Sequence, residues 1–507
     1  MLPFLLRRLF WMVPTLLLVS LASFLFLSFV PDPTDDEAVR ASLSPDEILT
    51  ERRERFVDLP RFLNVAPLDV RRRTLDAVAE VSAGGTDAEH GARELVRLGA
   101  AALPHVIPAL DAFSPETRTR IALALAPIAS RMHLHNRDSA ARPDTAALFW
   151  TRVWTDRNVE FTTSSVRTAV ERLARYRTAT RAEEVEELDT FALEAIMLRL
   201  RRPETEADVE VARALVDALA HATGRADRIG EGFTLDEARG TIERWRTFWF
   251  IYGTDYKTLD GGGRASALVL ETRYGKWAHS VVTSFGAGSK TPPAMVRVAR
   301  GAPTTFTIVF GAIFIAYAVG VLLGVVSAVS RGRSLDLVTA TTVLAAHSVP
   351  TALVAVAVSR LCGPTTHLLL PTLVVALGLV AAPTRHQRAA LAATLSSDFV
   401  RAAVARGAGR WRAVVVHGLR SSLVPVITLA TLEPPMALGA AFVVEHVFGL
   451  RGLGALTIEA VTTRDTGYLM ALSVVLAGIA SVAVVITDVA HGLVDPRTRH
   501  KLARGRT

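Results

Sequence analysis

The stretch Ser396-Ser-Asp-Phe-Val-Arg-Ala-Ala-Val-Ala-Arg-Gly-Ala-Gly-Arg-Trp-Arg-Ala-Val-Val-Val-His-Gly-Leu-Arg420 is basic and amphipathic, and it separates two strongly apolar runs, residues 366–384 and 421–444. From Arg385 to Arg420 the chain carries seven arginines and a single acid, Asp398. Short cationic loops are retained on the cytoplasmic side when a membrane protein inserts. The stretch therefore predicts a cytoplasmic loop between two membrane spans.

Within this loop the residues predict two short helices joined by a turn. Ser396 or Ser397 can cap the first helix, and Asp398 favours its positive end. Gly407 permits a turn that a side chain with a Cβ would resist. The second helix has an apolar face made of Trp411, Val414 and Val415. The expected result is a helix–turn–helix knob at the membrane surface.

The knob resembles the "EAA" coupling loop of permease subunits in bacterial ABC importers. The matching residues are Ala402, Ala403, Gly407 and Leu419. The family's leading Glu is Arg401 here, and its closing Pro is Arg420; both departures are similar to the oligopeptide/dipeptide branch. This resemblance implies that the loop contacts an ATPase through Asp398, Arg401, Ala402, Ala403, Gly407, Arg410 and Leu419. The alternative is an ordinary basic loop without a partner.

The same resemblance extends over residues 1–33 and 273–501 and leaves the centre of the chain unmatched. Its most specific pieces outside the loop are Ser348-Val-Pro350, Val444-Glu-His-Val-Phe448 with Gly452-Leu-Gly454, Arg464-Asp465, Asp488 and Leu493-Val-Asp-Pro-Arg497. It implies an all-α fold of the type I ABC importer (MetI-like) class.

Hydropathy independently predicts six membrane spans. The apolar runs are 9–30, 302–329, 336–359, 366–384, 421–444 and 467–490. Each run is about 20 residues or longer, which suffices to cross a bilayer. The first run exceeds the apolar core of a cleavable signal peptide, so an uncleaved span is expected there. Both termini are predicted to be cytoplasmic, because Arg7, Arg8 and a basic tail flank the outer spans.

The predicted domains follow from this topology. They are a first span at 1–33, an extracytoplasmic insertion at 34–270, a linker with an interfacial helix at 271–301, a permease core at 302–494 with its coupling loop at 385–420, and a cytoplasmic tail at 495–507. The insertion is polar and helical by periodicity. Residues 92–128 look like one HEAT-type helical hairpin, which neighbouring helices must cover. Further helices are expected at 161–178, 183–201, 206–222 and 235–251.

Nothing in the sequence predicts catalysis, a cofactor or a nucleic-acid partner. A Walker A sequence is absent, so ATP hydrolysis is expected from separate subunits. The pair His133 and His135 is a weak metal hint, because two histidines on a polar loop are more often solvated. One cysteine, Cys362, excludes an intrachain disulfide. No metal site is predicted.

Several ionisable residues fall inside predicted spans, where charges are costly and usually face a cavity or a partner, and two of them are candidates for the translocation path. Glu433 precedes Pro434 and Pro435, which open local backbone carbonyls. It is a candidate for the translocation path, or else it caps a broken helix or pairs with a neighbouring subunit. His347 is a second candidate for the path, with a satisfied buried histidine as the alternative.

Together these features predict the membrane subunit of an ATP-driven importer of oligopeptides or dipeptides working by alternating access. The resemblance implies two cytoplasmic ABC ATPases, a second homologous permease forming a heterodimer or homodimer, an extracytoplasmic substrate-binding protein and a lipid bilayer. Nickel or another non-peptide solute is an alternative cargo. A different class of function is a membrane-anchored scaffold or sensor whose helical domain binds a partner. The residues do not determine the substrate or the role of the insertion.

Overall fold

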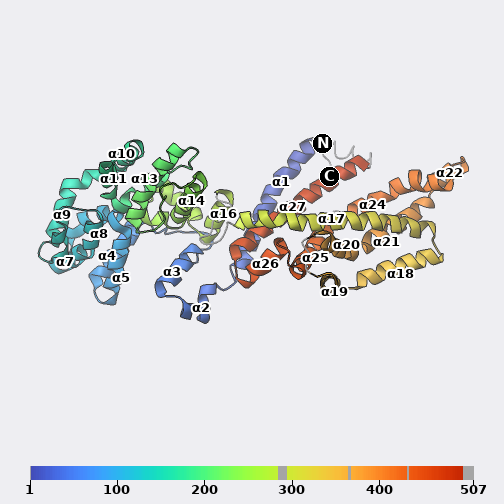
Figure 1. Ribbon diagram of the computed structural model, residues 1–507, viewed down its shortest axis with the longest axis horizontal. Helices are drawn as coiled ribbons and strands as arrows, with labels where there is room; N and C mark the ends of the chain where they lie inside the picture. Colours follow the sequence, from blue (N-terminus) through green and yellow to red (C-terminus); the bar gives the residue numbers. More distant parts are fainter. Residues whose placement is uncertain (1, 284–293, 364–366, 431–432, 495–507) are drawn as a thin grey trace. The chain divides into compact units, whose positions relative to one another are not determined.

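A computed structural model describes residues 2–283, 294–363, 367–430 and 433–494. Every regular element in these ranges is a helix (Figure 1). The chain divides into two compact units. The first, which we call the polar unit, is Ser44–Lys276 with Gly288–Lys290; the second, the apolar unit, holds Met1–Leu43, Trp277–Ala287 and Thr291–Thr507. The predicted cytoplasmic tail at 495–507 and part of the predicted linker lie outside the described residues.

The polar unit is a stack of short helices around one core. Its helices are α3 (Pro45–Glu54), α4 (Val70–Ala83), α5 (Thr86–Leu98), α6 (Leu103–Val106), α7 (Pro115–Ala124), α8 (Ala126–Arg131), α9 (Ala146–Arg157), α10 (Thr163–Tyr176), α11 (Ala179–Glu186), α12 (Leu193–Arg199), α13 (Glu206–Thr223), α14 (Leu235–Tyr252) and α15 (Gly261–Leu270), and α16 (Arg273–Thr283) crosses the boundary between the units. The aromatic end of α14 contributes to the core, where Trp245 is 1% exposed.

Local sequence explains where several of these helices begin. Capping boxes start α3, α13 and α14, each with a hydroxyl residue at the N-cap and an acid three residues later. Each box satisfies two backbone N–H groups that the first turn would otherwise leave without a partner. The helices expected at 206–222 and 235–251 match α13 and α14, and the helix expected at 161–178 matches α10.

The helix expected at 183–201 is wrong as a single element. α11 ends at Glu186, and α12 begins only at Leu193. Between them Asp189 adopts a left-handed conformation with φ of 47° and is buried. Its carboxylate accepts hydrogen bonds from the backbone N–H of Ala100 at 2.9 Å and from Arg131 Nη2 at 2.7 Å. These partners are remote in sequence, so the helical period of the segment does not reveal the break.

Residues 92–128 form helices that turn back on one another, but the first arm is fragmented. α5 ends at Leu98, just before Gly99, whose φ is 62°. One short 3-10 turn precedes α6 and another follows it. The segment Thr86–Ala112 is long and apolar enough to cross a membrane by length and composition. Its buried side chains instead belong to the core of the polar unit, so neighbouring helices cover this hairpin as expected. Its HEAT-type character stays a prediction.

A buried carboxylate joins the early helices of the polar unit to its end. Asp255 forms ion pairs with Arg73 Nε at 2.7 Å and Arg97 Nη1 at 2.8 Å, and it accepts a hydrogen bond from Arg53 Nη1 at 3.2 Å. Glu94 adds a second acid, with Arg97 Nη2 to Glu94 Oε1 at 2.6 Å. Burial opposes ionisation of Glu94, but the hydrogen bond from Arg97 and the charges of Arg97, Arg73 and Arg53 together outweigh it and lower the pKa of Glu94. Three arginines and two acids therefore connect α3, α4 and α5 with the residues after α14.

We expect Asp255→Ala to destabilise the polar unit by about 3–5 kcal/mol, because it leaves three largely buried guanidinium groups without their common partner. Thermal unfolding of the purified chain measures the loss. Asp236→Ala is the matched control, since the Asp236 side chain is 91% exposed in its ion pair with Arg239 and its removal costs at most about 0.5 kcal/mol. Equal effects of both substitutions would contradict the assignment.

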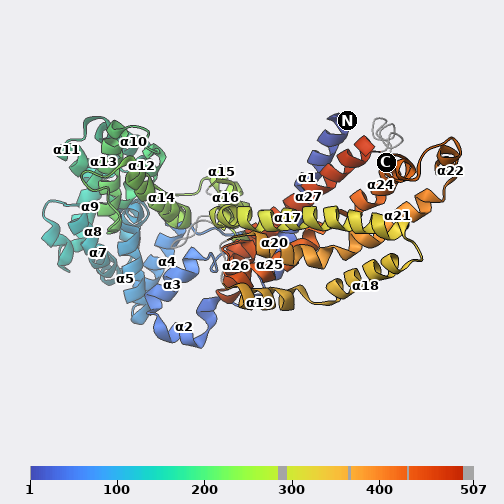
Figure 2. The same cartoon turned by 45° about the vertical axis from the view of Figure 1, so that its right-hand side comes forward.

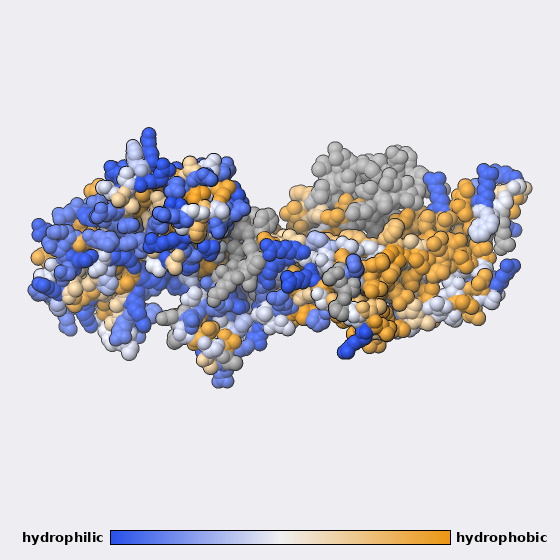
Figure 3. Space-filling model, in the orientation of Figure 1, coloured by the Kyte–Doolittle hydropathy of each residue, from blue (hydrophilic) through white to orange (hydrophobic). Residues whose placement is uncertain are grey.

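The apolar unit is built from long helices. They are α1 (Leu2–Leu27), α2 (Glu37–Ser42), α17 (Ala294–Val329), α18 (Ser334–Ser348), α19 (Thr351–Cys362), α20 (Leu369–Leu379), α21 (Ala381–Leu395), α22 (Asp398–Ala405), α23 (Arg410–Arg412), a π-helical segment (Ala413–Leu419), α24 (Arg420–Ala430), α25 (Glu433–Phe448), α26 (Leu453–Thr462) and α27 (Thr466–Val494). α17 runs alongside α20 and α21, and α1 lies along α27 (Figure 1, Figure 2). A hydrophobic surface covers the middle of this unit, and hydrophilic side chains return near α22 (Figure 3).

Several predicted spans are bent or divided. The run 336–359 is two helices, α18 and α19, at 85° to each other, and α20 meets α21 at 46°. α21 continues to Leu395, so the first part of the predicted coupling loop is helix rather than loop. The run 421–444 is shared between α24 and α25. α17 is continuous from Ala294 through Pro303, so the helix expected before residue 302 is the first part of α17, and its interfacial position stays a prediction.

By length and composition, four helices of the described residues can cross a membrane, or up to seven if each bent pair counts as one span. One of the four is Thr86–Ala112 of the polar unit. α17 alone has 36 residues, a length of about 54 Å against a hydrocarbon core of about 30 Å. Part of α17 therefore extends beyond any bilayer that it crosses.

Close backbone packing holds α17 against α21. A Cβ built on Gly320 would lie 2.7 Å from Pro383 Cγ, and one on Gly324 would lie 2.8 Å from the Thr384 carbonyl oxygen. Small residues four apart allow this approach of two helices. On the same side, Gln387 is fully buried and donates from Nε2 to Ser422 Oγ at 2.8 Å. α21, which leads into the knob, is thus held against α17 and α24.

Candidate functional site

The knob predicted at 396–420 forms two short helices around a turn. α22 begins at Asp398, and the turn follows at Gly407, whose φ of 92° suits glycine. The amide of Gly407 donates to the Val404 carbonyl at 2.9 Å. Asp398 is exposed and lies 3.9 Å from Arg401. Ala402 is also exposed, whereas Ala403 is 6% exposed and packs inward.

Two details of the knob differ from the expectation. Ser397 occupies the N-cap position of α22, but its hydroxyl donates to the Thr394 carbonyl and does not cap the helix. The second arm is α23 followed by a π-helical segment that ends at Leu419, which is half-buried. π-helical turns are rare and occur often at functional sites. The side chain of Arg410 lies outside the described residues.

The predicted apolar face of the second arm is divided between the core and the surface. Val414 is 3% exposed and packs with Leu391 and Ala328. Trp411 is 68% exposed and Val415 is 52% exposed, so they point away from this cluster. The knob therefore has an exposed apolar surface, which comprises Phe399, Val404, Trp411, Val415 and Val416.

An ion pair that the sequence analysis missed ties the base of the knob to the turn before α18. Arg388 donates from Nε to Asp336 Oδ1 and from Nη2 to Asp336 Oδ2, both at 2.8 Å. The backbone N–H of Gly332 also donates to Asp336, at 3.1 Å. A bidentate arginine–carboxylate pair fixes orientation as well as distance. The sequence did contain one sign of this ion pair. Asp336 is an acid at the start of an apolar run, and an acid in such a place usually has a partner.

A second missed site lies where α25 meets α26. Glu445 is fully buried, accepts from Thr305 Oγ1 at 2.6 Å and accepts from the backbone N–H of Gly454 at 2.7 Å. Thr305 in turn accepts from the backbone N–H of Leu453 at 2.8 Å. The two side chains thereby cap the N-terminus of α26. A Cβ on Gly452 would lie 2.3 Å from the Glu445 carboxylate, which explains the Gly-Leu-Gly sequence.

The structure brings the two path candidates together. Glu433, 6% exposed, begins α25, and Tyr317 of α17 donates to its Oε1 at 3.5 Å. His347 of α18 interacts electrostatically with Glu433. Its Nδ1 lies 3.0 Å from the carbonyl oxygen of Gly378, and its ring is exposed rather than buried. Tyr317 of α17 and Glu433 of α25 thus form a polar contact within the apolar unit, and His347 of α18 interacts with Glu433 only electrostatically.

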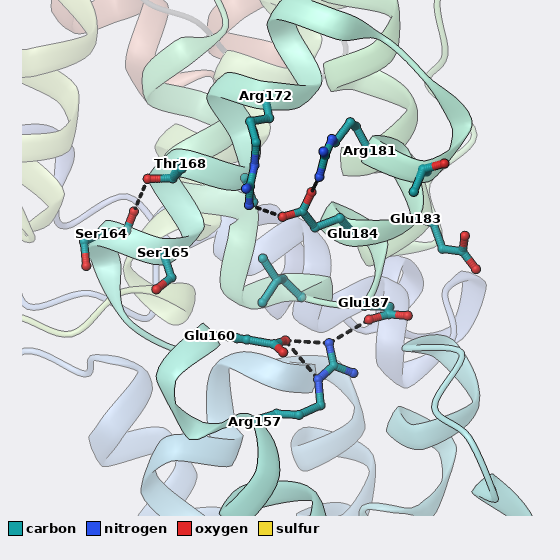
Figure 4. A pocket seen from close by; sticks show the side chains of 13 residues that line it. Arg157, Glu160, Ser164, Ser165, Thr168, Arg172, Arg181, Glu183, Glu184 and Glu187 are labelled. Carbon is teal, nitrogen blue, oxygen red and sulfur yellow. Dashed lines mark hydrogen bonds and ion pairs between the residues drawn. The ribbon is translucent and has the colours of Figure 1, made fainter.

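The polar unit has a groove of about 650 Å³ between α10 and α11 (Figure 4). Most of its charged side chains are paired with one another. Arg157 donates to Glu187 at 2.7 Å, Arg181 to Glu184 at 2.8 Å, and Arg172 also contacts Glu184. The groove is therefore polar but close to neutral. The sequence analysis did not identify it, because its residues come from separate helices.

Comparison with known proteins connects this geometry to a family. Residues 320–500 match the model of the binding-protein-dependent transport system inner membrane component. The dipeptide transport system permease protein DppB of Bacillus subtilis is 32% identical over 238 residues, which are 44% of this chain and 77% of that protein. The chain belongs to this permease family.

Two other relatives agree with this placement. The oligopeptide transport system permease protein OppB of Mycobacterium tuberculosis is 30% identical over 260 residues, which are 45% of this chain and 80% of that protein. A putative peptide permease protein of Brucella suis is 33% identical over 222 residues, which are 39% of this chain and 69% of that protein. The chain is thus an all-α, multi-pass permease of the inner membrane, and it is a transport component rather than an enzyme.

The family match includes the knob, the Asp336–Arg388 pair, Glu433 and Glu445. The polar unit at Ser44–Lys276 lies outside the residues that this family model matches. The residues that the family model matches therefore lie in the apolar unit.

We expect Gly454→Ala to destabilise the apolar unit by about 3 kcal/mol, the upper range for overpacking. A Cβ at this position would lie 2.3 Å from Phe442 Cα, so the backbone must shift and the bond to Glu445 weakens. Thermal unfolding in detergent measures the loss. Gly439→Ala in α25 is the control, because its Cβ meets open space, and it should be neutral or slightly stabilising. Equal melting temperatures for the two variants would refute the capping role of Glu445.

Proposed function

We propose that this permease moves oligopeptides or dipeptides across the inner membrane by ATP-driven alternating access. The observation that carries the proposal is the exposed apolar surface of the knob, in a chain whose relatives are named dipeptide and oligopeptide permeases. A tryptophan that is 68% exposed beside four other exposed apolar residues on a basic knob suits a protein partner. Two cytoplasmic ABC ATPases are the proposed partners, one for each permease of the pore.

Hydrogen bonds, an ion pair and close packing connect the knob to the spans, so a force on the knob would be transmitted to them. The base of the knob is α21, which Arg388 ties to Asp336 at the α17–α18 turn. Gln387 ties α21 to α24, and glycines of α17 pack against it closely. A displacement of the knob by closing ATPases would therefore move α17, α18, α21 and α24 together. This coupling is the role proposed for Asp398, Arg401, Ala402, Ala403, Gly407, Arg410 and Leu419.

Six spans are proposed for the apolar unit, with α18–α19, α20–α21 and α24–α25 each forming one span. Large apolar side chains remain exposed on this unit, among them Phe314, Leu322 and Leu337. They suit lipid or a second, homologous permease that completes the pore as a heterodimer or homodimer. Glu433 and His347 are proposed to line the path, where Glu433 would meet a cationic group such as a peptide amine.

The proposed topology places both termini in the cytoplasm and residues 34–301 outside it, where a substrate-binding protein would deliver the peptide. The arginines of the knob, the α17–α18 turn and the chain ends then all lie on one side, as cationic loops require.

Trp411→Ala tests the coupling. We expect it to weaken ATPase binding by about 2 kcal/mol, or roughly 30-fold, as the loss of a buried aromatic anchor does. Substrate-stimulated ATP hydrolysis by the reconstituted complex should fall accordingly, while the permease still inserts. Leu335→Ala is the control, since Leu335 is 59% exposed outside the knob. If Trp411→Ala hydrolyses ATP and transports at the parental rate, the knob is not the coupling surface.

Cysteine labelling tests the topology. Cys362 is exposed and is first replaced by serine. Leu148→Cys then probes the polar unit and Phe399→Cys the knob, since these side chains are 74% and 50% exposed. An impermeant thiol reagent added to intact spheroplasts should label only the cysteine at 148, and lysis should expose the one at 399. The reverse pattern would invert the topology.

A second candidate function is a scaffold or sensor whose polar unit binds a partner. The groove between α10 and α11 favours it, because its polar lining suits a polar partner. The coupling test separates the candidates: a scaffold predicts no ATPase binding to the knob.

A further inference from the structure

Three side chains of the polar unit converge from separate segments. His133 follows α8, Glu186 is the last residue of α11, and His221 lies near the end of α13. Each offers one ligand atom, and the three atoms lie within 4.8 Å of one another. The two imidazole rings face each other with centroids 5.3 Å apart. His133 is exposed, and Glu186 and His221 are half-buried, so the cluster is accessible to an ion from solvent.

The tautomer of His221 is set by its surroundings. Nε2 lies 2.9 Å from the carbonyl oxygen of Arg131. A carbonyl only accepts hydrogen bonds, so Nε2 carries the hydrogen and Nδ1 keeps its lone pair. Arg131 is itself held by Asp189 at 2.7 Å and by the Val96 carbonyl at 3.1 Å. A histidine that donates its other N–H to a fixed carbonyl is the arrangement typical of metal ligands.

Glu186 differs from the other acids around it. On the same helix Glu184 pairs with Arg172 and Arg181, and Glu187, just beyond it, pairs with Arg157. Among the described residues, neither Glu186 nor the ring of His133 has a hydrogen bond or ion pair of its own. Asp217, one turn before His221, interacts electrostatically with Glu186 and adds negative charge. Asp217 is itself paired with Arg228 at 3.7 Å, whereas the carboxylate of Glu186 remains available as a ligand.

We propose that the polar unit contains a site for a divalent transition metal of the zinc class, with His133, Glu186 and His221 as ligands. Two imidazoles and a carboxylate suit Zn²⁺, with water or a partner's ligand in the fourth position. Ca²⁺ and Mg²⁺ need more oxygen ligands and should not bind. Ligands around tetrahedral zinc lie about 3.4 Å apart, so the exposed ring of His133 closes toward the other two on binding.

The sequence alone suggests that His133 and His135 are both solvated, whereas the proposed site uses His133 and not His135. His133 finds its partners in α11 and α13, whereas His135 is exposed and lies outside the cluster. A bound ion would cross-link the end of α8 to α11 and α13. It would thus stabilise the polar unit without any part in ATP hydrolysis.

Zinc titration of the full-length permease tests the site. The chain is purified in detergent without a polyhistidine tag, stripped with a chelator, and titrated against a chromophoric zinc competitor. We expect one tight Zn²⁺ per chain and at least a 10-fold weaker affinity in His133→Asn and in Glu186→Gln. Asparagine is chosen because His133 has φ of 52°, a conformation that asparagine tolerates. His135→Ala is the matched control and should bind as the parent does.

Thermal unfolding supplies a second readout. Saturating Zn²⁺ should raise the melting temperature of the parent and of His135→Ala by about 5 °C. The melting temperatures of the two site variants should stay unchanged with zinc and match the parent without metal. Parental zinc affinity in both His133→Asn and Glu186→Gln, or no tight zinc in the parent, would overturn the site. Stabilisation of the parent by Ca²⁺ or Mg²⁺ would overturn the zinc-class assignment.

Discussion

The apolar unit depends on hydrogen-bond partners for its buried polar groups. The carboxylate of Glu445, which is fully buried, shows this constraint. In hydrocarbon every polar group needs a partner within the protein. Glu445 and Thr305 together satisfy the backbone N–H groups at the start of α26, where the chain turns by 80° after α25. The same requirement explains the Asp336–Arg388 pair and the Gln387–Ser422 bond. Each of these polar interactions joins two structural elements. The need of buried polar groups for hydrogen-bond partners therefore helps to determine how the helices are arranged.

The polar unit depends on a different constraint, which is that the ends of its short helices need hydrogen-bond partners. Its helices are short, and many end at turns where the backbone needs remote partners. Asp255 collects three arginines, and Asp189 receives a backbone N–H of the Gly99 turn together with Arg131. These hydrogen bonds and ion pairs connect segments 58 to 202 residues apart in sequence, such as Arg131 with Asp189 and Arg53 with Asp255.

The two units suggest a division of work. The apolar unit carries the residues that the family model matches, including the knob, Glu433 and Glu445. The polar unit carries the groove and the proposed zinc site, outside that match. The proposed transport cycle thus depends on the shared part of the chain, whereas what distinguishes this permease from its relatives is expected in the polar unit.

The sequence by itself determined the all-α class, the permease family, the place of the knob and the turn at Gly407. The family comes from the resemblance of the coupling loop and its flanks, and the other features follow from local chemistry: hydropathy, charge in short loops and a glycine that a turn requires. Only the tertiary structure decided that Trp411 faces outward and Val414 inward, that 183–201 breaks at Asp189, and that Arg388 binds Asp336. It also decided that His133 meets Glu186 and His221 while His135 does not. These outcomes depend on partners far away in the chain, and helical periodicity and residue spacing hold no information about such partners.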